Sequence, residues 1–274
     1  MIPVASVVTK KSISEFLLLK LSIEQYHEVD WHISVDEFVY ENLGTFKNVK
    51  MLNLIKTDDC SHGTDDPVKN RLFLELVMTK FDALRSGVSK HGYCLFVDAD
   101  IFFTGPIEEK VLSLMKNSSI DAILSPHMTN NLGLETQVGH YNVGFFSMRN
   151  LSYLEQHAAM SWRHKEFGMY YEQQPLQFCS YPFLTVNLPI NYNIGWWRFN
   201  ESHTKYRLDL LNLKDDKIYF GDLPAICFHV HTLKELDYKN YGDFLVKKVL
   251  DLMSQSSNQN YLMMLKYINE LSKN

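Results

Sequence analysis

Apolar positions along the chain follow two different periods. Short apolar runs of the kind found in buried strands lie at residues 3–9, 30–35, 50–55, 94–97 and 121–125. Helical spacing of apolar side chains is found at residues 12–27, 69–88 and 107–116. Because strand and helix alternate, we expect an α/β fold with a Rossmann-like, doubly wound mixed sheet that is mostly parallel. In such sheets ligands bind beyond the carboxyl ends of the strands.

The second half of the chain has weaker periodicity. The strands predicted there lie at residues 141–148 and 225–231. The predicted helices lie at residues 151–167 and 172–179, followed by one or two amphipathic helices within 243–271. No internal repeat or linker composition separates these segments, so the sequence predicts a single domain.

Composition narrows the class of protein. The chain has 274 residues, 46% of them hydrophobic, which suffices for a large core, and its net charge of −5 gives no basic footprint for nucleic acid. The four cysteines form no Cys-x-x-Cys pair, which argues against a disulfide framework or a zinc site. The first residues resemble a strand more than a signal peptide, and no apolar stretch approaches the ~20 residues of a transmembrane segment. We expect a cytoplasmic protein whose C-terminal helices leave peripheral membrane contact open.

Two carboxylates interrupt the apolar segment at residues 94–103, which reads Cys-Leu-Phe-Val-Asp-Ala-Asp-Ile-Phe-Phe. Asp98 and Asp100 stand at positions i and i+2, so on an extended strand they point the same way and repel each other. A divalent cation held by oxygen ligands would offset this repulsion. The alternative, two solvated aspartates in a surface turn, is disfavoured by the apolar residues that follow at once. The pair therefore predicts a metal site for a phosphate-bearing ligand.

The segment Phe96-Val97-Asp98-Ala99-Asp100-Ile101-Phe102-Phe103 resembles the Asp-x-Asp motif of the metal-dependent glycosyltransferases of the GT-A fold. The resemblance extends over residues 3–235, through the helix that carries Lys80, through Asn142-Val143-Gly144 and through a late strand ending in histidine. It implies transfer of a hexose from a nucleotide-diphosphate sugar, a UDP- or GDP-sugar, to a hydroxyl acceptor such as a glycan. It also implies Mn²⁺ or Mg²⁺ as the cofactor.

The same resemblance divides the chain. Residues 1–240 would form the catalytic domain, with a donor-binding half at about 1–125 and an acceptor half at about 126–240. Residues 241–274 would be C-terminal helices packed on that domain.

The metal ligands implied by the resemblance are Asp98, Asp100 and a histidine near the end of the catalytic domain. His229 and His231 both fit, and His231 is favoured because it closes the predicted strand; the alternative is one core and one surface histidine. Lys234 would approach the donor diphosphate. The residues after His231 depart from the glycine and Lys-Pro-Trp pattern of glycogenin-like enzymes, so no subfamily is assigned.

Other donor contacts are implied at strand ends and on the helix before the metal motif. Lys80 would contact phosphate or sugar, unless it is a solvated helix residue. Thr9 and Asp36 would contact base and ribose, although an aspartate at a strand end is also a common helix cap. Asn142 and Gly144 would approach the donor sugar, unless they form a strand-entry bulge. The implied donor-binding residues are Thr9, Asp36, Lys80, Asp98, Ala99, Asp100, Asn142, Gly144 and Lys234.

The acceptor side is assigned to the second half of the chain. Glu172 matches the acidic residue that inverting members use as general base, and Gln173 would bind sugar. The alternative for Glu172 is the first turn of a helix, where the dipole favours a carboxylate. Trp196 and Trp197, with Tyr192, offer flat faces for sugar rings, and one tryptophan is expected in the core.

Three other functions use parts of this pattern. A phosphatase or phosphotransferase of the haloacid dehalogenase type also combines Asp-x-Asp with magnesium, but a threonine commonly stands where this chain has Phe102. A sugar nucleotidyltransferase shares the fold, yet no glycine-rich loop follows the first strand here. A carbohydrate-binding protein would keep the aromatic residues without needing metal ligands.

Overall fold

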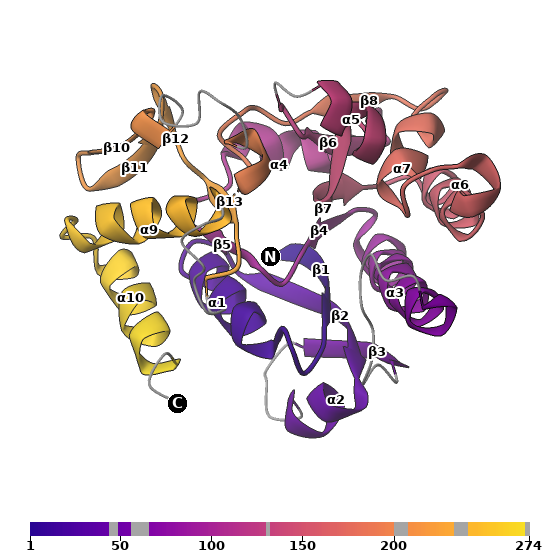
Figure 1. Ribbon diagram of the computed structural model, residues 1–274, viewed down its shortest axis with the longest axis horizontal. Helices are drawn as coiled ribbons and strands as arrows, with labels where there is room; N and C mark the ends of the chain where they lie inside the picture. The colour runs from indigo at the N-terminus through magenta and orange to yellow at the C-terminus, as the bar shows by residue number, and fades with distance from the viewer. Residues whose placement is uncertain (44–48, 56–65, 130–131, 200–207, 233–240, 272–274) are drawn as a thin grey trace.

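A central sheet runs through the molecule (Figure 1). The computed structural model describes residues 1–43, 49–55, 66–129, 132–199, 208–232 and 241–271. In these residues the sheet has seven strands, in the order β3 (Val49–Ile55), β2 (Val29–Asp36), β1 (Ile2–Val8), β4 (Cys94–Val97), β7 (Tyr141–Met148), β6 (Ala122–Pro126) and β8 (Thr185–Asn187). Only β7 runs antiparallel to its neighbours. The predicted doubly wound, mostly parallel α/β sheet is therefore confirmed.

Helices cover both faces of this sheet. The helices of the described part of the chain are α1 (Ile13–Glu24), α2 (Glu37–Leu43), α3 (Pro67–His91), α4 (Glu109–Lys116), α5 (Leu132–Val138), α6 (Leu151–Trp162), α7 (Gln173–Cys179), α9 (Tyr241–Ser254) and α10 (Gln259–Leu271). On one face, Phe16 of α1 packs edge-on against Trp31 of β2, with ring centroids 5.1 Å apart. On the other face, Phe81 and Leu84 of α3 share a buried cluster with Phe96 of β4.

Helix α3 carries sequence signals at both ends. The Asp66 carboxylate accepts hydrogen bonds from the N–H groups of Val68, at 2.9 Å, and Lys69, at 3.3 Å. Pro67 occupies the first helical position, where its missing N–H costs nothing. The helix ends at Gly92, whose φ of 77° is a conformation that glycine adopts readily. Between these ends the helix packs against β1, β2 and β4.

The apolar segment 94–103 is two strands and not one. β4 ends at Val97, and the chain enters a three-stranded sheet made of β5 (Ile101–Phe103), β13 (Cys227–His229) and β9 (Ile194–Gly195). β13 is antiparallel to β5 and parallel to β9. A further small sheet that the sequence did not predict consists of β10 (Leu211–Lys214), β11 (Lys217–Phe220) and β12 (Leu223–Pro224).

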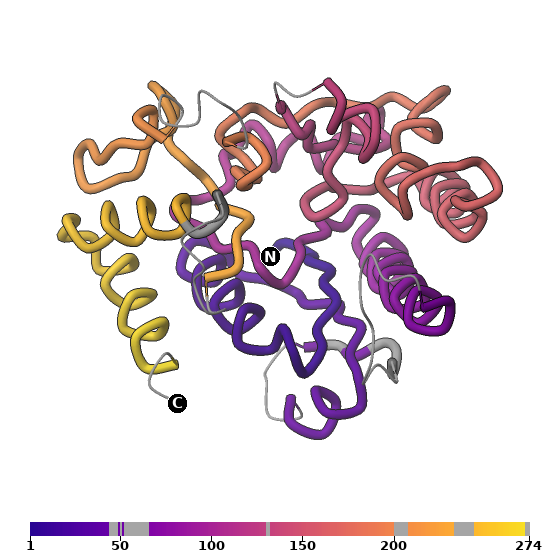
Figure 2. Tube along the Cα trace, viewed as in Figure 1, coloured from indigo at the N-terminus to yellow at the C-terminus, as the bar shows by residue number. Residues whose placement is uncertain are grey.

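The end of the chain folds back beside its beginning (Figure 2). α9 and α10 share a buried cluster with Leu18 of α1 and Phe102 of β5. The Tyr261 hydroxyl donates to the carbonyl of Thr104 at 2.9 Å, and that of Tyr267 donates to a carbonyl of α1 at 3.1 Å. The C-terminal helices therefore pack on the body that holds the sheet. Among the described residues, no helix combines the length and apolar character that crossing a membrane requires.

Several element boundaries differ from those predicted. The helix predicted at 151–167 ends at Trp162, and a 3₁₀-helix follows at His164–Phe167. The last strand is limited to Cys227–His229 because its partner β5 offers only three residues to pair with. Helices α2 and α5 were not predicted, since α2 buries only Val39 and Leu43 and α5 buries no side chain, so neither shows a clear helical period.

Candidate functional site

Two adjoining cavities open beyond the carboxyl ends of β1 and β4. The first, of about 540 Å³, is lined from β7, α7, β13 and the two adjacent tryptophans. The second, of about 480 Å³, is lined from the end of β1, from α1 and from α3. Both are lined by Phe73, Asp98, Asp100, Glu172 and His231. The crevice expected at the strand ends is therefore present, and the Asp-x-Asp pair lies between its two parts.

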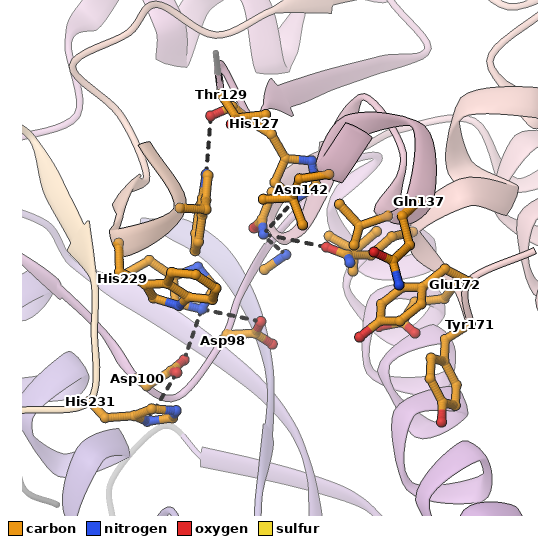
Figure 3. A pocket seen from close by; sticks show the side chains of 18 of the residues that line it. Asp98, Asp100, His127, Thr129, Gln137, Asn142, Tyr171, Glu172, His229 and His231 are labelled. Atoms are coloured by element: carbon orange, nitrogen blue, oxygen red, sulfur yellow. Dashed lines mark hydrogen bonds and ion pairs between the residues drawn. The ribbon is translucent and has the colours of Figure 1, made fainter. Parts of the chain in front are cut away.

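Asp98 and Asp100 lie in the turn that connects the two sheets. The Asp98 N–H donates to the carbonyl of Gly144 at 2.7 Å, which extends the β4–β7 ladder by one residue. The Ile101 N–H donates to the Asp98 carbonyl at 3.1 Å and closes the turn. The alternation of a continuous strand therefore does not explain why the carboxylates converge, which corrects the argument from spacing. They converge because the turn presents both to β13 (Figure 3).

His229 faces both aspartates. The register of β13 on β5 sets His229 opposite Ile101, the residue that follows Asp100. Its Nε2 lies 3.1 Å from Oδ1 of Asp100 and 3.7 Å from Oδ2 of Asp98. One ligand atom from each of these three residues lies within 4.8 Å of the others. His231 Nδ1 is 3.2 Å from the second oxygen of Asp100, but its side chain is half exposed. The geometry favours His229 as the third ligand, because its Nε2 faces both aspartates. β13 ends at His229, so His231 lies beyond the strand.

A chain of hydrogen bonds fixes the His229 ring. Oδ1 of Asn142 accepts a hydrogen bond from the N–H of Gly144 at 2.9 Å. The same oxygen lies 2.9 Å from the Asn193 amide, which must therefore present its donor, Nδ2, to it. Oδ1 of Asn193 is then left to face Nδ1 of His229 at 3.0 Å. An amide oxygen only accepts, so Nδ1 carries a proton, and Nε2 is the nitrogen that faces the aspartates and would bind a metal ion. Metal-binding histidines are oriented in the same way by outer hydrogen bonds.

Charge and burial set the protonation of the three residues. Burial raises the pKa of Asp98 to about 6, against the opposing influence of Lys80 and His229. Burial acts in the same sense on Asp100, but His229 and His231 outweigh it and hold the pKa of that carboxyl below its usual range. Burial lowers the pKa of His229, and its contacts with Asp100 and Asp98 reverse this and leave the pKa raised. Two carboxylates and an imidazole lone pair form a donor set that fits Mn²⁺ or Mg²⁺.

Gly144 leaves room for the candidate metal ligands. A Cβ at this position would lie 2.3 Å from Cε1 of His229, 2.5 Å from Oδ2 of Asp98 and 2.9 Å from Oδ1 of Asn142. Any other residue here would displace the ring or the carboxylate. Asn142 and Gly144 both line the first cavity, and they also support His229.

Lys80 and Glu172 form a buried ion pair at the boundary of the cavities. Nζ of Lys80 lies 2.7 Å from Oε1 of Glu172, and the two residues are 3% and 6% exposed. The ammonium also lies 4.9 Å from the centroid of the Phe96 ring. Lys80 is therefore not a solvated helix residue. Glu172 lies at the start of α7, as in the first-turn alternative, but its carboxylate makes no capping hydrogen bond there and pairs with Lys80 instead.

A polar wall of the first cavity includes Gln173. Its Oε1 lies 3.4 Å from Nδ2 of Asn142. His127 lies beside them, with Nδ1 2.8 Å from the carbonyl of Gly139. Burial lowers the pKa of His127 to about 4, so its imidazole is neutral at pH 7 and offers both a donor and an acceptor.

The adjacent tryptophans occupy different environments. Trp197 is 7% exposed, donates from Nε1 to the carbonyl of His127 at 3.0 Å and meets the His229 ring edge-on at 5.1 Å. Its ring folds over Gly195, where a Cβ would lie 2.1 Å from it. Trp196 is 41% exposed and lines the first cavity. One tryptophan is therefore packed and one is available, as the sequence predicted.

Some of the other residues named from the sequence line a cavity and some do not. Thr9 and Ala99 line the second cavity. Asp36 lines neither cavity, and its two carboxylate oxygens accept backbone N–H groups at 2.7 and 2.9 Å, one of them at the start of α2. In the structure Asp36 therefore caps helix α2, which was the alternative to a contact with the donor. Tyr192 is fully buried, so its prediction as a platform for sugar was wrong. Lys234 lies outside the described residues.

Sequence reasoning missed Asn193 and His127, which both contribute to the site. Neither belongs to the motifs that were considered, and both reach the site through contacts distant in sequence. One signal pointed to Asn193. The chain contains two tripeptides of Asn, a β-branched residue and Gly, at 142–144 and 193–195, whose asparagines bond to each other. Their glycines make room for the rings of His229 and Trp197.

Solved structures share this architecture. The chain superposes on the galactosyltransferase LgtC, solved in complex with donor and acceptor sugar analogues, with a TM-score of 0.57, 11% identity and coverage of 96% of this chain and 100% of that one. Mouse xyloside xylosyltransferase 1 gives a TM-score of 0.51 at 11% identity, covering 83% and 97%. Glycosyltransferase GlyE of Streptococcus pneumoniae gives 0.54 at 10% identity, covering 98% and 63%. Comparison with protein-family models and with curated protein sequences gave no match. The chain has the GT-A glycosyltransferase fold, which was the fold expected.

Proposed function

We propose that the chain is a metal-dependent glycosyltransferase that moves a hexose from a nucleotide-diphosphate sugar to a hydroxyl acceptor such as a glycan. The observation that carries this proposal is the convergence of Asp98, Asp100 and His229 between two cavities. The second cavity suits the nucleotide and the first suits the acceptor, so the diphosphate and the sugar would lie between them. The fold of the solved transferases supports the proposal as an analogy.

Asp98, Asp100 and His229 are the proposed ligands of Mn²⁺ or Mg²⁺, and Mn²⁺ is preferred because one ligand is an imidazole. When bound, the ion neutralises the charge that develops on the nucleoside diphosphate as the sugar–phosphate bond breaks. Asn193 keeps the proton of His229 on Nδ1 and thereby keeps Nε2 able to bind. Neither aspartate acts as nucleophile or base in this scheme.

Lys80 is the proposed partner of the donor diphosphate. It lines the second cavity, whereas Glu172 lines both. A bound diphosphate is an anion that competes with Glu172 for the Lys80 ammonium. When the ammonium turns to the diphosphate, the carboxylate loses its compensating charge and becomes a stronger base. Donor binding would in this way prepare Glu172 for its step.

Glu172 is the proposed general base. It takes the proton of the acceptor hydroxyl, whose oxygen attacks the anomeric carbon, and the nucleoside diphosphate departs with the electrons of the broken bond. This role corresponds to transfer with inversion. Gln173 and Trp196 are the proposed acceptor contacts, the first by hydrogen bonding and the second by stacking on a sugar ring.

The finer assignments complete the proposal. Thr9, Ala99, Asn142 and Gly144 are proposed donor contacts, and Lys234 is proposed to approach the diphosphate. The donor is a UDP- or GDP-sugar. The free, buried thiols among the described cysteines fit a reducing cytoplasm, which is where we place the protein.

The test is nucleoside diphosphate release by the purified chain from a panel of UDP- and GDP-sugars with Mn²⁺. We expect EDTA to abolish release, Mn²⁺ to restore it, and Asp100→Asn to lower it at least about 100-fold. Release that neither EDTA nor this substitution affects would overturn the proposal. Glycan binding without release would favour a carbohydrate-binding protein, and cleavage of a phosphomonoester would favour a phosphatase.

A further inference from the structure

A second cluster of metal-binding side chains lies away from the two cavities. It consists of Asp30 and His32 of β2 and His91 at the end of α3. β2 begins at this cluster and ends at Asp36, six residues later, which is roughly 20 Å along an extended strand. The cluster is therefore at the opposite end of the sheet from the candidate functional site, and the proposed transfer reaction does not use it.

The three ligand atoms of this cluster are close together. Oδ2 of Asp30 lies 3.3 Å from Nε2 of His32 and 2.7 Å from Nε2 of His91. The imidazole rings stand nearly perpendicular, with centroids 5.7 Å apart. One donor atom from each residue lies within 4.8 Å of the others. Ligands at the ~2.0–2.1 Å bond lengths of zinc stand roughly 3.3 Å apart in a tetrahedron, so small shifts suffice for coordination.

The surroundings hold these side chains in place. His32 is fully buried and Asp30 is 8% exposed. Nδ1 of His32 lies 3.0 Å from Oγ of Ser86, a contact that holds the ring with Nε2 toward Asp30. Gly87 allows α3 to lie against β4 beside the cluster, since a Cβ on it would collide with the Cys94 sulfur and would lie 3.5 Å from Cδ2 of His32. The site would thus be built on a rigid strand and helix, with access from solvent through the less buried His91.

We propose that Asp30, His32 and His91 form a transition-metal site, and that Zn²⁺ is the ion it takes. Two imidazoles and one carboxylate are the ligand types zinc uses, and three protein ligands leave a fourth position for water. This set differs from the two-carboxylate set at Asp98 and Asp100, which suits a harder ion. The site uses no cysteine, so the cysteine pattern of the sequence gave no sign of it.

Lys90 competes with the ion for the same carboxylate. Its Nζ lies 2.5 Å from Oδ2 of Asp30, while its side chain is 52% exposed. Burial would raise the pKa of Asp30, but the hydrogen bonds from Lys90 and His91 outweigh it and keep the carboxyl charged, as a metal ligand must be. The half-exposed ammonium can turn to solvent when the ion binds. Removing the Lys90 ammonium should therefore strengthen metal binding. If Lys90 and Asp30 formed only a structural ion pair, its removal would not change metal binding.

The experiment uses the full chain carrying Asp100→Asn, so that the candidate functional site is disabled. The protein is stripped with EDTA and titrated with Zn²⁺ or Co²⁺ alone. We expect one equivalent to bind, Co²⁺ to give visible absorption bands of a low-symmetry histidine site, and saturating Zn²⁺ to raise Tm by roughly 5–10 °C. His91→Asn should abolish these signals. Lys90→Met should tighten binding about fivefold, the equivalent of one exposed ion pair.

His140→Asn is the matched control, because that histidine pairs with a single carboxylate, Glu135, and lies outside the cluster. It should leave zinc binding unchanged. Circular dichroism of each stripped variant verifies folding. Absence of stoichiometric binding, or binding that His91→Asn and Lys90→Met both leave unchanged, would overturn the proposal. Loss of the transfer reaction would have no bearing on it, since the readouts are metal binding and stability in a disabled background.

Discussion

The ammonium of Lys80 lies 2.7 Å from the carboxylate of Glu172, and both side chains are almost completely buried. Breaking such a pair leaves a buried charge without compensation. We expect Lys80→Met to lower the free energy of unfolding by about 3–5 kcal/mol, measured by urea denaturation. Arg85→Met is the control, because the Arg85–Glu155 pair is exposed and should contribute about 1 kcal/mol or less. Equal effects of the two substitutions would contradict the role of burial.

Glu172→Gln tests the proposed base. The amide keeps the size of the side chain but cannot accept a proton, so kcat should fall about 10²–10⁴-fold while the KM for the donor changes little. Initial rates at saturating donor and acceptor measure this. Glu166→Gln, which alters an exposed glutamate paired with Arg163, should leave kcat unchanged. A kcat within tenfold of the wild type for Glu172→Gln would remove Glu172 from the proton transfer.

Gly144→Ala tests the packing under the metal ligands. The added methyl group would collide with His229 and Asp98, so we expect Mn²⁺ affinity to fall more than about 100-fold. Isothermal titration with Mn²⁺ measures the affinity. Gly105→Ala is the comparison, since a Cβ there meets its nearest neighbour at 3.4 Å. If the alanine at 144 leaves Mn²⁺ binding intact, His229 and Asp98 are not the ligands.

Asn193 is a positioning residue in the proposed site. Asn193→Leu removes the acceptor of the His229 Nδ1 proton and frees the ring to turn, so Mn²⁺ affinity should fall about 10–100-fold. Asn191→Leu is a matched control, because Asn191 is equally buried but donates to the carbonyl of Pro224. It should cost stability without changing Mn²⁺ affinity. Equal affinities for the two variants would argue against the hydrogen-bond chain.

His157 links stability to pH. It is fully buried, and burial lowers its pKa from 6.5 to about 4, against the hydrogen bond to the Glu172 carbonyl. Below pH 6.5 the unfolded chain takes up this proton and the folded chain does not, so stability falls as pH decreases toward 4. His157→Gln keeps an N–H donor without titrating. Between pH 7 and 5 it should lose about 2 kcal/mol less stability than the wild type, as urea denaturation at each pH would show.

Local patterns were sufficient to predict the sheet and its helices. Runs such as those around Val4 and Trp31 are buried on both faces, and the long helix before β4 has an N-cap at Asp66 and a glycine end at Gly92. Helices α2 and α5 and the β10–β12 sheet were not predicted, because these short segments bury too few side chains to give a clear period. The end of the last strand was predicted wrongly because it depends on the neighbouring strand, since β13 ends where its pairing with β5 ends.

Residues of the candidate site were predictable where they belong to a chemical motif. Asp98, Asp100 and Glu172, which were named from their position in the sequence, line the cavity, and so does His229, although the sequence favoured His231. Asn193 and the pairing of Lys80 with Glu172 depend on contacts between distant segments, which no local period encodes. Asp36 shows the converse, because a strand-end aspartate fits a ligand contact and a helix cap equally well until its neighbours are known.

The turn that carries Asp98 and Asp100 joins a strand of the central sheet to one of a separate small sheet, and His229 arrives on a strand from near the end of the chain. During synthesis the two aspartates would therefore emerge long before their third partner. A polypeptide truncated before residue 227 would keep both aspartates yet lack the imidazole opposite them and the strand that pairs with β5. Full metal affinity at this site would thus require that the late strand β13 has been made and has folded onto β5.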